Sequence, residues 1–135
     1  AGDTLLATAV GVGNPHCVVR CTAELETLPW RRWGATLEVS PLFQNKTNCQ
    51  FVRVISRHVV QARIWERGAG ETSASGSSSC AIAAAMVRLG LMESDVEIVM
   101  PGGSLYVSVG SDWAVTLTGP VAEVGQMCVS KALLG

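Results

Sequence analysis

The polar side chains that could do chemistry in this 135-residue sequence stand at the expected ends of strands and helices. They are Asn14, His16, Asn48, Glu66, Arg67 and the serine-rich stretch 75–79. An arginine beside a helix N-terminus suits a carboxylate, because both offer N–H donors and positive charge. A glutamate with nearby amide oxygens suits an ammonium group. Together these groups would suit an amino acid.

The stretch from Glu66 to Ala81 is the most informative part of the chain. It leaves an alternating strand, passes through Gly68-Ala69-Gly70 and opens a helix of small residues. The first N–H groups of a helix lack internal partners, so a glycine-bearing loop leading into a helix can bind an anion. The alternative is a serine-rich surface loop before a helix. No Ser-His-Asp order is evident, and serines at a helix start are more often caps than nucleophiles.

The segment Asn14-Pro15-His16 is expected to form a turn, within a turn cluster over residues 11–16. The proline favours an extended backbone at Asn14 and fixes its own φ. An amide and an imidazole would then stand at defined angles beside a strand end. The alternative is an ordinary Asn-Pro turn with a solvated histidine.

Hydrophobic patterning predicts two main helices and several short strands. One helix starts near Thr27 and Pro29, places Trp30, Trp33 and Leu37 on one face, and ends before Ser40-Pro41. The second covers residues 76–89 and stops at Gly90. Strands are expected over 4–12, 17–21, 49–56, 59–67, 96–100, 105–109, 113–117 and 121–130.

The second helix is apolar all round until Arg88, which is typical of a buried helix. In the strand over 59–67, Val60, Ala62 and Ile64 should share one buried face. The expected fold is α+β: a mixed, mostly antiparallel sheet curled around a central buried helix.

Composition narrows the function classes. A length of 135 residues with 48% hydrophobic residues predicts one domain with a real core. The net charge of −1 with no basic run argues against nucleic-acid binding. No apolar stretch approaches the roughly 18–20 residues of a membrane span, and the first residues lack the positive region of a signal peptide. The expected location is cytoplasmic.

The five cysteines predict neither a disulfide framework nor a metal site. They are odd in number, form no CxxC pair and mostly lie in apolar runs, so buried reduced thiols are expected. Only His16 and His58 could supply imidazole ligands. No metal is expected.

Three blocks together resemble the diaminopimelate epimerase family. They are residues 13–16 (Gly-Asn-Pro-His), residues 47–51 (Thr-Asn-Cys-Gln-Phe) and residues 66–76, which begin Glu-Arg-Gly-Ala-Gly-Glu-Thr. Their order and spacing match, and the resemblance runs over essentially the whole chain. Wider relatives of the same fold include hydroxyproline epimerase-like and phenazine-biosynthesis-like isomerases.

The resemblance implies a cofactor-free site that inverts the α-carbon of diaminopimelate, a step toward lysine and peptidoglycan precursors. Two cysteines on opposite faces of the substrate exchange its α-proton. Asn14, Asn48, Glu66 and Arg67 would bind the substrate. Gly76 and Ser77 would hold the reacting α-carboxylate at the helix start. His16 would be an accessory residue near the site.

Two departures from the family pattern bear on activity. The family has two similar halves, and residues 1–135 resemble the C-terminal domain only. The N-terminal half-domain, with the first catalytic cysteine, would be a missing partner. In addition, Ser75 stands at the position of the second catalytic cysteine. A serine hydroxyl is far less acidic than a thiol and needs a separate base. A smaller departure is Ser78, where glycine is usual.

The sequence therefore predicts an isomerase domain that is inactive by itself. Two alternatives stay open: a non-catalytic ligand-binding or assembly module, and an isomerase of the wider fold family acting on another small carboxylate. A half-protein would also expose an apolar surface, which favours a homo-oligomer.

Overall fold

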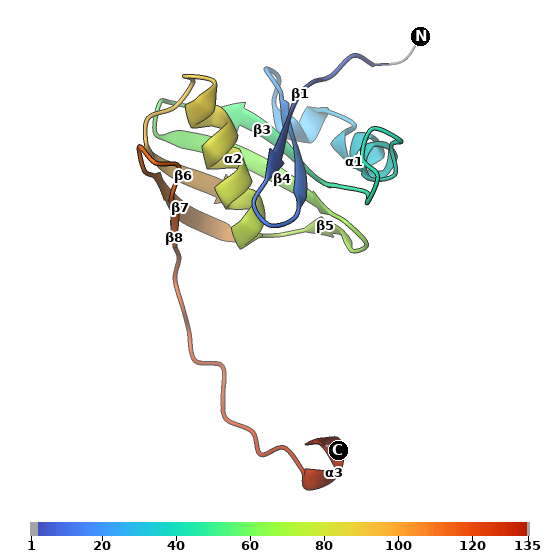
Figure 1. The fold of residues 1–135 in the computed structure, drawn as a ribbon, viewed down its shortest axis with the longest axis vertical. Coiled ribbons are helices and arrows are strands. Elements are labelled where there is room, and N and C mark those ends of the chain that lie inside the picture. The colour runs from blue at the N-terminus through green and yellow to red at the C-terminus, as the bar shows by residue number, and fades with distance from the viewer. Residues whose placement is uncertain (1–2, 135) are drawn as a thin grey trace.

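The computed structural model describes residues 3–134 and contains one curled, mixed sheet (Figure 1). Its strands are β1 (Leu6–Gly11), β2 (Pro15–Arg20), β3 (Asn48–Val54), β4 (Val59–Glu66), β5 (Gly70–Thr72), β6 (Asp95–Met100), β7 (Gly103–Val109) and β8 (Val115–Thr118). The order is β1-β2-β3-β4-β6-β7-β8, with β5 beside β4. The pairs β2–β3 and β4–β6 are parallel, and the other five pairs are antiparallel. The expected α+β class with a mostly antiparallel sheet is confirmed.

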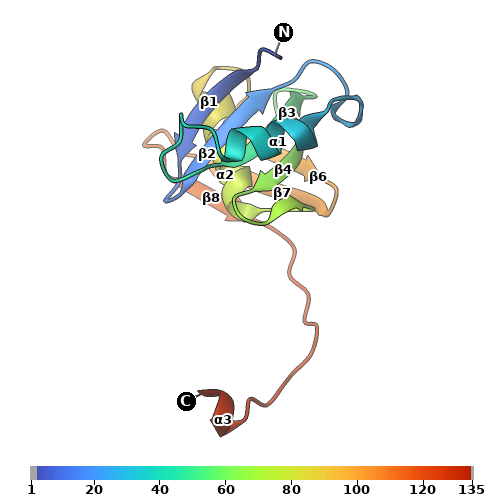
Figure 2. The same cartoon turned by 90° about the vertical axis from the view of Figure 1, so that its right-hand side faces the viewer.

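The two long helices pack on opposite faces of this sheet. The α1 helix (Trp30–Glu38) contacts β3, β4 and β5, while α2 (Gly76–Arg88) contacts β1, β2, β3, β6, β7 and β8. Figure 2 shows α1 in front of the strands and α2 behind them. Two shorter helices are η1 (Leu25–Thr27) and α3 (Lys131–Leu134). No helix within residues 3–134 has the length and apolarity needed to cross a bilayer.

Alternation along the strands divides the apolar residues between two cores. On the α2 side, Val60, Ala62 and Ile64 are fully buried, as the sequence predicts. On the α1 side, the buried strand residues pack against Trp30; they are Cys17, Val19, Cys49 and Phe51. Because successive strand residues face opposite ways, a residue's parity along a strand decides which helix it meets.

The α1 helix confirms the predicted tryptophan face. Trp30 and Trp33 pack against the Phe51 ring, with centroids 6.0 and 6.1 Å apart. Its start differs from the prediction, because Pro29 takes the N-cap position and Thr27 ends η1 instead. Proline suits this position, where no intrahelical N–H is required.

The α2 helix has well-formed ends. Ser75 is its N-cap, and its last turn closes with Gly90 at a φ of +69°. The N–H of Gly90 donates to the Val87 carbonyl and that of Leu91 to the Met86 carbonyl, which is the Schellman pattern. Along one stripe of the helix, Cys80, Ala84 and Val87 are partly exposed. Among the described residues, the sheet therefore leaves one stripe of α2 partly uncovered. The all-apolar sequence of the helix predicts burial on every side, so this part of the prediction is not confirmed.

The expected strand over residues 121–130 is wrong. This segment has no regular structure and projects from the body of the molecule (Figure 1). Val121, Val124 and Met127 are 97%, 101% and 88% exposed. Its β-branched residues have the propensity for a strand, but within residues 3–134 no sheet edge pairs with it, and a strand needs a pairing partner.

Two smaller differences concern the ends of strands. Pro15 and His16 lie in β2 rather than in a turn, because β2 pairs with β1 as far as Pro15. The strand β5 was missed, since three residues carry too little pattern to be recognised. It pairs with the end of β4 through a turn in which Gly68 and Gly70 have positive φ.

Candidate functional site

Three of the predicted site residues occupy neighbouring strands at one end of the sheet. His16 of β2 is the register partner of Asn48 of β3. Asn48 in turn comes opposite Glu66 of β4, one step beyond the paired residues Cys49 and Trp65. All three have the strand parity that faces α2. The topology thus brings His16, Asn48 and Glu66 into one row on the α2 side.

Asn48 joins two of the family-like blocks by its side chain. Its Nδ2 donates to the Pro15 carbonyl at 2.9 Å, and its Oδ1 accepts from the Arg67 N–H at 2.9 Å. The residue is only 7% exposed. Asn48 therefore fixes the start of the β4–β5 turn relative to β2.

His16 is buried and held at both ring nitrogens. Nε2 lies 2.9 Å from Asn14 Oδ1, and Nδ1 lies 2.9 Å from Gln50 Nε2. Burial lowers the pKa of His16, although the Gln50 hydrogen bond and the Glu66 charge act in the opposite direction. The ring is 1% exposed, so the alternative of a solvated histidine is wrong.

The start of α2 is tied to this row through Gln50. Gln50 Nε2 donates to Ser78 Oγ at 3.0 Å, and the Ser78 N–H donates to Ser75 Oγ at 3.4 Å. The Ser75 carbonyl also accepts from Ser79 Oγ at 2.8 Å. Within residues 3–134, the N–H groups of Gly76 and Ser77 have no hydrogen-bond acceptor. They remain available to an anion, as the helix start predicts.

Arg67 lines an open cavity together with Asn14. Its Nη1 donates to the Asn45 carbonyl at 2.9 Å. The cavity has a volume of about 660 Å³ and includes Asn14, Arg67, Asn45 and Lys46 in its lining. Arg67 and Asn14 therefore border the same space.

Glu66 and Glu71 differ in their surroundings, although both belong to the most specific block. The Glu66 side chain is partly buried and has no hydrogen-bond or ion-pair partner within the described residues 3–134. Glu71 receives two hydrogen bonds from Arg31 of α1, at 2.6 and 2.8 Å. Glu66 is thus the carboxylate that remains for a ligand.

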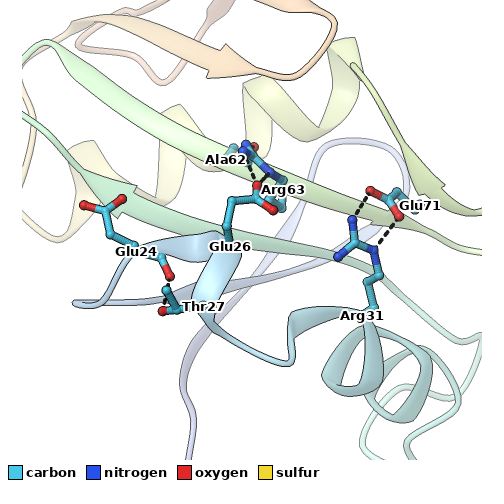
Figure 3. Close-up of polar contacts among 7 residues, drawn as sticks. All are labelled: Glu24, Glu26, Thr27, Arg31, Ala62, Arg63 and Glu71. Atoms are coloured by element: carbon cyan, nitrogen blue, oxygen red, sulfur yellow. Dashed lines mark hydrogen bonds and ion pairs between the residues drawn. The ribbon is translucent and has the colours of Figure 1, made fainter.

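Ion pairs on the opposite face hold the β4–β5 hairpin against the α1 side. Figure 3 shows Arg31 pointing to Glu71 and Arg63 of β4 pointing to Glu26 of η1. Glu38 adds a third tie, accepting from Trp65 Nε1 at 2.8 Å. Such exposed pairs individually contribute little, but together they fix the segment that carries Glu66.

Glu38 also accepts a hydrogen bond from the Gly68 N–H at 2.9 Å. The Trp65 and Gly68 donors lower the pKa of the Glu38 carboxyl below its usual value. A charged Glu38 therefore supports the turn directly after Arg67.

The cysteines supply no activated thiol to this row. Burial raises the pKa of Cys17, Cys21 and Cys80, and raises that of Cys49 to about 12. All five cysteines are free. Cys17 and Cys49 are buried as expected, whereas Cys128 is exposed, contrary to the expectation, because it lies in the projecting segment. Among residues 3–134, no three His, Cys, Asp or Glu side chains cluster as metal ligands would.

Two residues of this region were not predicted as site residues. Gln50 and Ser78 connect His16 to the start of α2. A signal for Gln50 was present in the sequence, since it is a polar residue two positions after Asn48 in an apolar strand. For Ser78 the sequence shows only that a serine stands where the family usually has glycine.

Sequence comparison relates this chain to a known family. The family model described as diaminopimelate epimerase matches residues 8–124. A diaminopimelate epimerase from Desulfitobacterium hafniense is 44% identical over 91% of this chain and 43% of its own length. Diaminopimelate epimerase 2 from a Nostoc species is 42% identical over 87% of this chain and 41% of its own length. The chain thus spans less than half the length of these relatives.

A solved structure shows the same fold at low sequence identity. A PhzF-family phenazine biosynthesis protein from Bacillus anthracis superposes with a TM-score of 0.57 at 17% identity, over 82% of this chain and 37% of that one. At this identity the similarity concerns the fold alone. The family match and the sequence relatives decide the assignment: this chain belongs to the diaminopimelate epimerase family.

Proposed function

We propose that residues 1–135 form the C-terminal domain of a diaminopimelate epimerase-like protein and carry one half of its substrate site. The observation that supports this best is the convergence of the family-like blocks at one end of the sheet. Asn48 bonds to both Pro15 and the Arg67 backbone, and Gln50 bonds to both His16 and Ser78. Hydrogen bonds therefore link three stretches far apart in sequence, and one of these bonds reaches the first turn of α2.

The ligand in this proposal is an amino acid of the diaminopimelate type. Arg67 and the Asn14 amide would hold one carboxylate in the cavity that both line. The free N–H groups of Gly76 and Ser77 would hold the α-carboxylate and stabilise charge as the α-proton leaves. Glu66 would face the ammonium group. His16 would act as an accessory residue, and no cofactor is required.

Ser75 limits the chemistry of the chain by itself. Its Oγ is used to cap α2, and within residues 3–134 no basic side chain bonds to it. A hydroxyl without a base is a poor proton acceptor at neutral pH. We therefore propose that this chain binds substrate weakly and does not epimerise it without a catalytic cysteine and a second half-domain.

The second half-domain would cover apolar surfaces that this fold leaves exposed. The partly exposed stripe of α2 and the projecting segment after β8 both carry apolar side chains that nothing covers among residues 3–134. Contact with a second half would bury them and enclose α2, giving the central buried helix of the sequence prediction. Self-association through the same surfaces is the competing outcome.

The test combines α-proton exchange with calorimetry, using meso-diaminopimelate. The proposal expects weak binding that is lost in Arg67→Ala, together with no incorporation of solvent deuterium at the α-carbon. Arg57→Ala is the matched control, since Arg57 pairs with Glu93 away from this site. Exchange by the unmodified chain would overturn the inactivity, and binding unaffected by Arg67→Ala would overturn the site.

Supplying a cysteine at position 75 together with an N-terminal half-domain provides the converse test. Ser75→Cys in a protein joined to an N-terminal half from a relative should gain exchange activity, whereas the Ser75 form of the same protein should not. Equal activity of both forms would favour the second candidate class, an isomerase of the wider fold family in which Ser75 is native. Binding without any exchange in either form would favour a non-catalytic module.

A further inference from the structure

A polar network of four side chains has a fixed direction of hydrogen bonding: the buried His16, Gln50 and Ser78, and the partly exposed Asn14. Gln50 Nε2 lies 2.9 Å from His16 Nδ1 and 3.0 Å from Ser78 Oγ, so both of its amide hydrogens are used. His16 Nδ1 must then accept, and the proton of the neutral ring sits on Nε2. Nε2 in turn donates to Asn14 Oδ1 at 2.9 Å.

The opposite direction would leave more buried groups unpaired. Gln50 is fully buried, and its Oε1 has no partner among residues 3–134. Turning the amide over would place its NH₂ group at this unpartnered position. Two buried N–H donors would then lack acceptors, where the present arrangement leaves one oxygen unpaired. Unpaired buried donors are costly, so the present direction is preferred.

The direction of hydrogen bonding in this polar network decides which atoms of the Asn14 amide are free to bind a ligand in the cavity. Because its Oδ1 accepts from His16, the group that remains is Nδ2, a pair of donors with no acceptor within the described residues. Asn14 lines the same cavity as Arg67. A donor amide beside a guanidinium suits a carboxylate, whereas an exposed Oδ1 would repel one.

We propose that Gln50 is a positioning residue that sets the His16 tautomer and thereby turns the Asn14 amide so that its N–H groups face the ligand carboxylate. The part that concerns the carboxylate rests on the proposed function. Burial of His16 keeps the imidazole neutral, which maintains the one-donor, one-acceptor state that this requires. The same Gln50 amide bonds Ser78 in the first turn of α2, so the Asn14 amide and the helix start are oriented by one group.

The decisive measurement is nitrogen-15 NMR of the His16 ring in the full 135-residue chain. The wild type should show an unprotonated Nδ1 and a protonated Nε2. Gln50→Glu, measured at alkaline pH, presents an ionised oxygen to Nδ1 and should move the proton to that nitrogen. Gln50→Met, which keeps the side-chain size without a donor, should give a mixture of tautomers. Gln61→Glu, on β4, is the matched control and should leave the wild-type pattern.

The Asn14 side chain gives a second, independent signal. Its NH₂ protons should exchange rapidly with solvent in the wild type and slowly in Gln50→Glu, because there they would bond to Nε2. Binding of meso-diaminopimelate at the same pH should weaken about tenfold in Gln50→Glu, equivalent to about 1.4 kcal/mol. It should be unchanged in Gln61→Glu.

The outcomes separate the two proposals. A wild-type ring with its proton on Nδ1, or an unchanged ring in Gln50→Glu, overturns the role of Gln50. If diaminopimelate binds none of these proteins while the ring responds as expected, the proposed function fails and the positioning role of Gln50 stands. If the ring responds but the variant binds diaminopimelate as tightly as the wild type, the link from Gln50 to carboxylate recognition is wrong.

Discussion

The Asn48 side chain accepts a hydrogen bond from the Arg67 backbone while it donates to the Pro15 carbonyl, both at 2.9 Å. One buried amide therefore joins the strand after the Asn14 turn to the turn that carries the proposed carboxylate-binding arginine. The position of the Arg67 backbone therefore depends on Asn48 of β3 as well as on the loop that contains Arg67.

Asn48→Ala should destabilise the fold by about 2–3 kcal/mol, because it removes two hydrogen bonds and leaves the partly buried Pro15 carbonyl without its donor. Urea unfolding would measure this loss, and hydrogen exchange should show a less protected Arg67 amide. Asn45→Ala is the control, since Asn45 bonds to Arg67 through its backbone carbonyl only. An Arg67 amide equally protected in Asn48→Ala would contradict the assigned role.

Ser75→Ala should lower stability by about 1 kcal/mol, the usual effect of losing an N-cap acceptor. Ser77→Ala, in the first turn of the same helix, should change stability by less than about 0.5 kcal/mol. Equal losses in the two variants, measured by denaturant unfolding, would argue against Ser75 as a cap.

Ser75→Cys should create the most reactive thiol of the chain apart from that of Cys128, which lies in the projecting segment. A thiol at a helix N-terminus has a lowered pKa, whereas burial raises the pKa of Cys17, Cys49 and Cys80. Alkylation followed by mass spectrometry across a pH series would compare these positions. A new cysteine that reacts no faster than Cys80 near neutral pH would show that the helix start does not activate it.

Glu38→Gln should reduce stability at neutral pH by about 0.5–1 kcal/mol, since the carboxylate accepts from Trp65 and Gly68 at a partly exposed site. The lowered pKa of Glu38 means that its contribution is complete above its unfolded value of about 4.3. The contribution disappears as the pH falls through the folded-state pKa. The difference between wild type and Glu38→Gln should therefore shrink in acid.

Urea unfolding at several pH values would follow this difference, with Glu123→Gln in the exposed tail as the control. A difference in unfolding free energy between wild type and Glu38→Gln that stays constant as the pH falls below the folded-state pKa of Glu38 would exclude a charge-dependent support of the Gly68 turn.

Gly34→Ala should destabilise the fold by about 1–3 kcal/mol, the usual range for overpacking. An added Cβ at Gly34 would lie 2.7 Å from Trp65 Cγ and 2.8 Å from Trp65 Cβ, atoms too close to the backbone to move freely. Alanine improves helix propensity by about 1 kcal/mol, so a net loss isolates the steric effect. Gly11→Ala, where the added Cβ meets nothing, should be tolerated. A more stable Gly34→Ala would show that α1 can shift away from β4.

The sequence predicted those parts of the fold that local patterns determine. The alternation of Val60, Ala62 and Ile64, the tryptophan face of α1 and the Gly90 stop of α2 depend on neighbouring residues, and all three are confirmed. The segment over 121–130 has the same local pattern as a strand but pairs with none of the described residues, and no local pattern shows whether such a partner exists.

The sequence predicts which residues could form the candidate site but not which of them are linked. Asn14, Asn48, Arg67 and the α2 start are predicted from their blocks; in the structure Asn48 bonds to Arg67, and Asn14 and Arg67 line one cavity. Gln50 was not identified, because its importance comes from β2 lying beside β3 in parallel register. That pairing joins strands separated by the whole of α1, which short-range patterns cannot reveal.

The projecting segment after β8 also has a calorimetric consequence. Val121, Val124 and Met127 of this segment are about as exposed in the folded chain as they would be after unfolding, so heating transfers almost none of their surface into water. The heat-capacity change of unfolding should then be nearly the same for the full chain and for a chain ending at Thr118. Removing an equal length of packed chain would lower that change by about 0.2 kcal/mol/K.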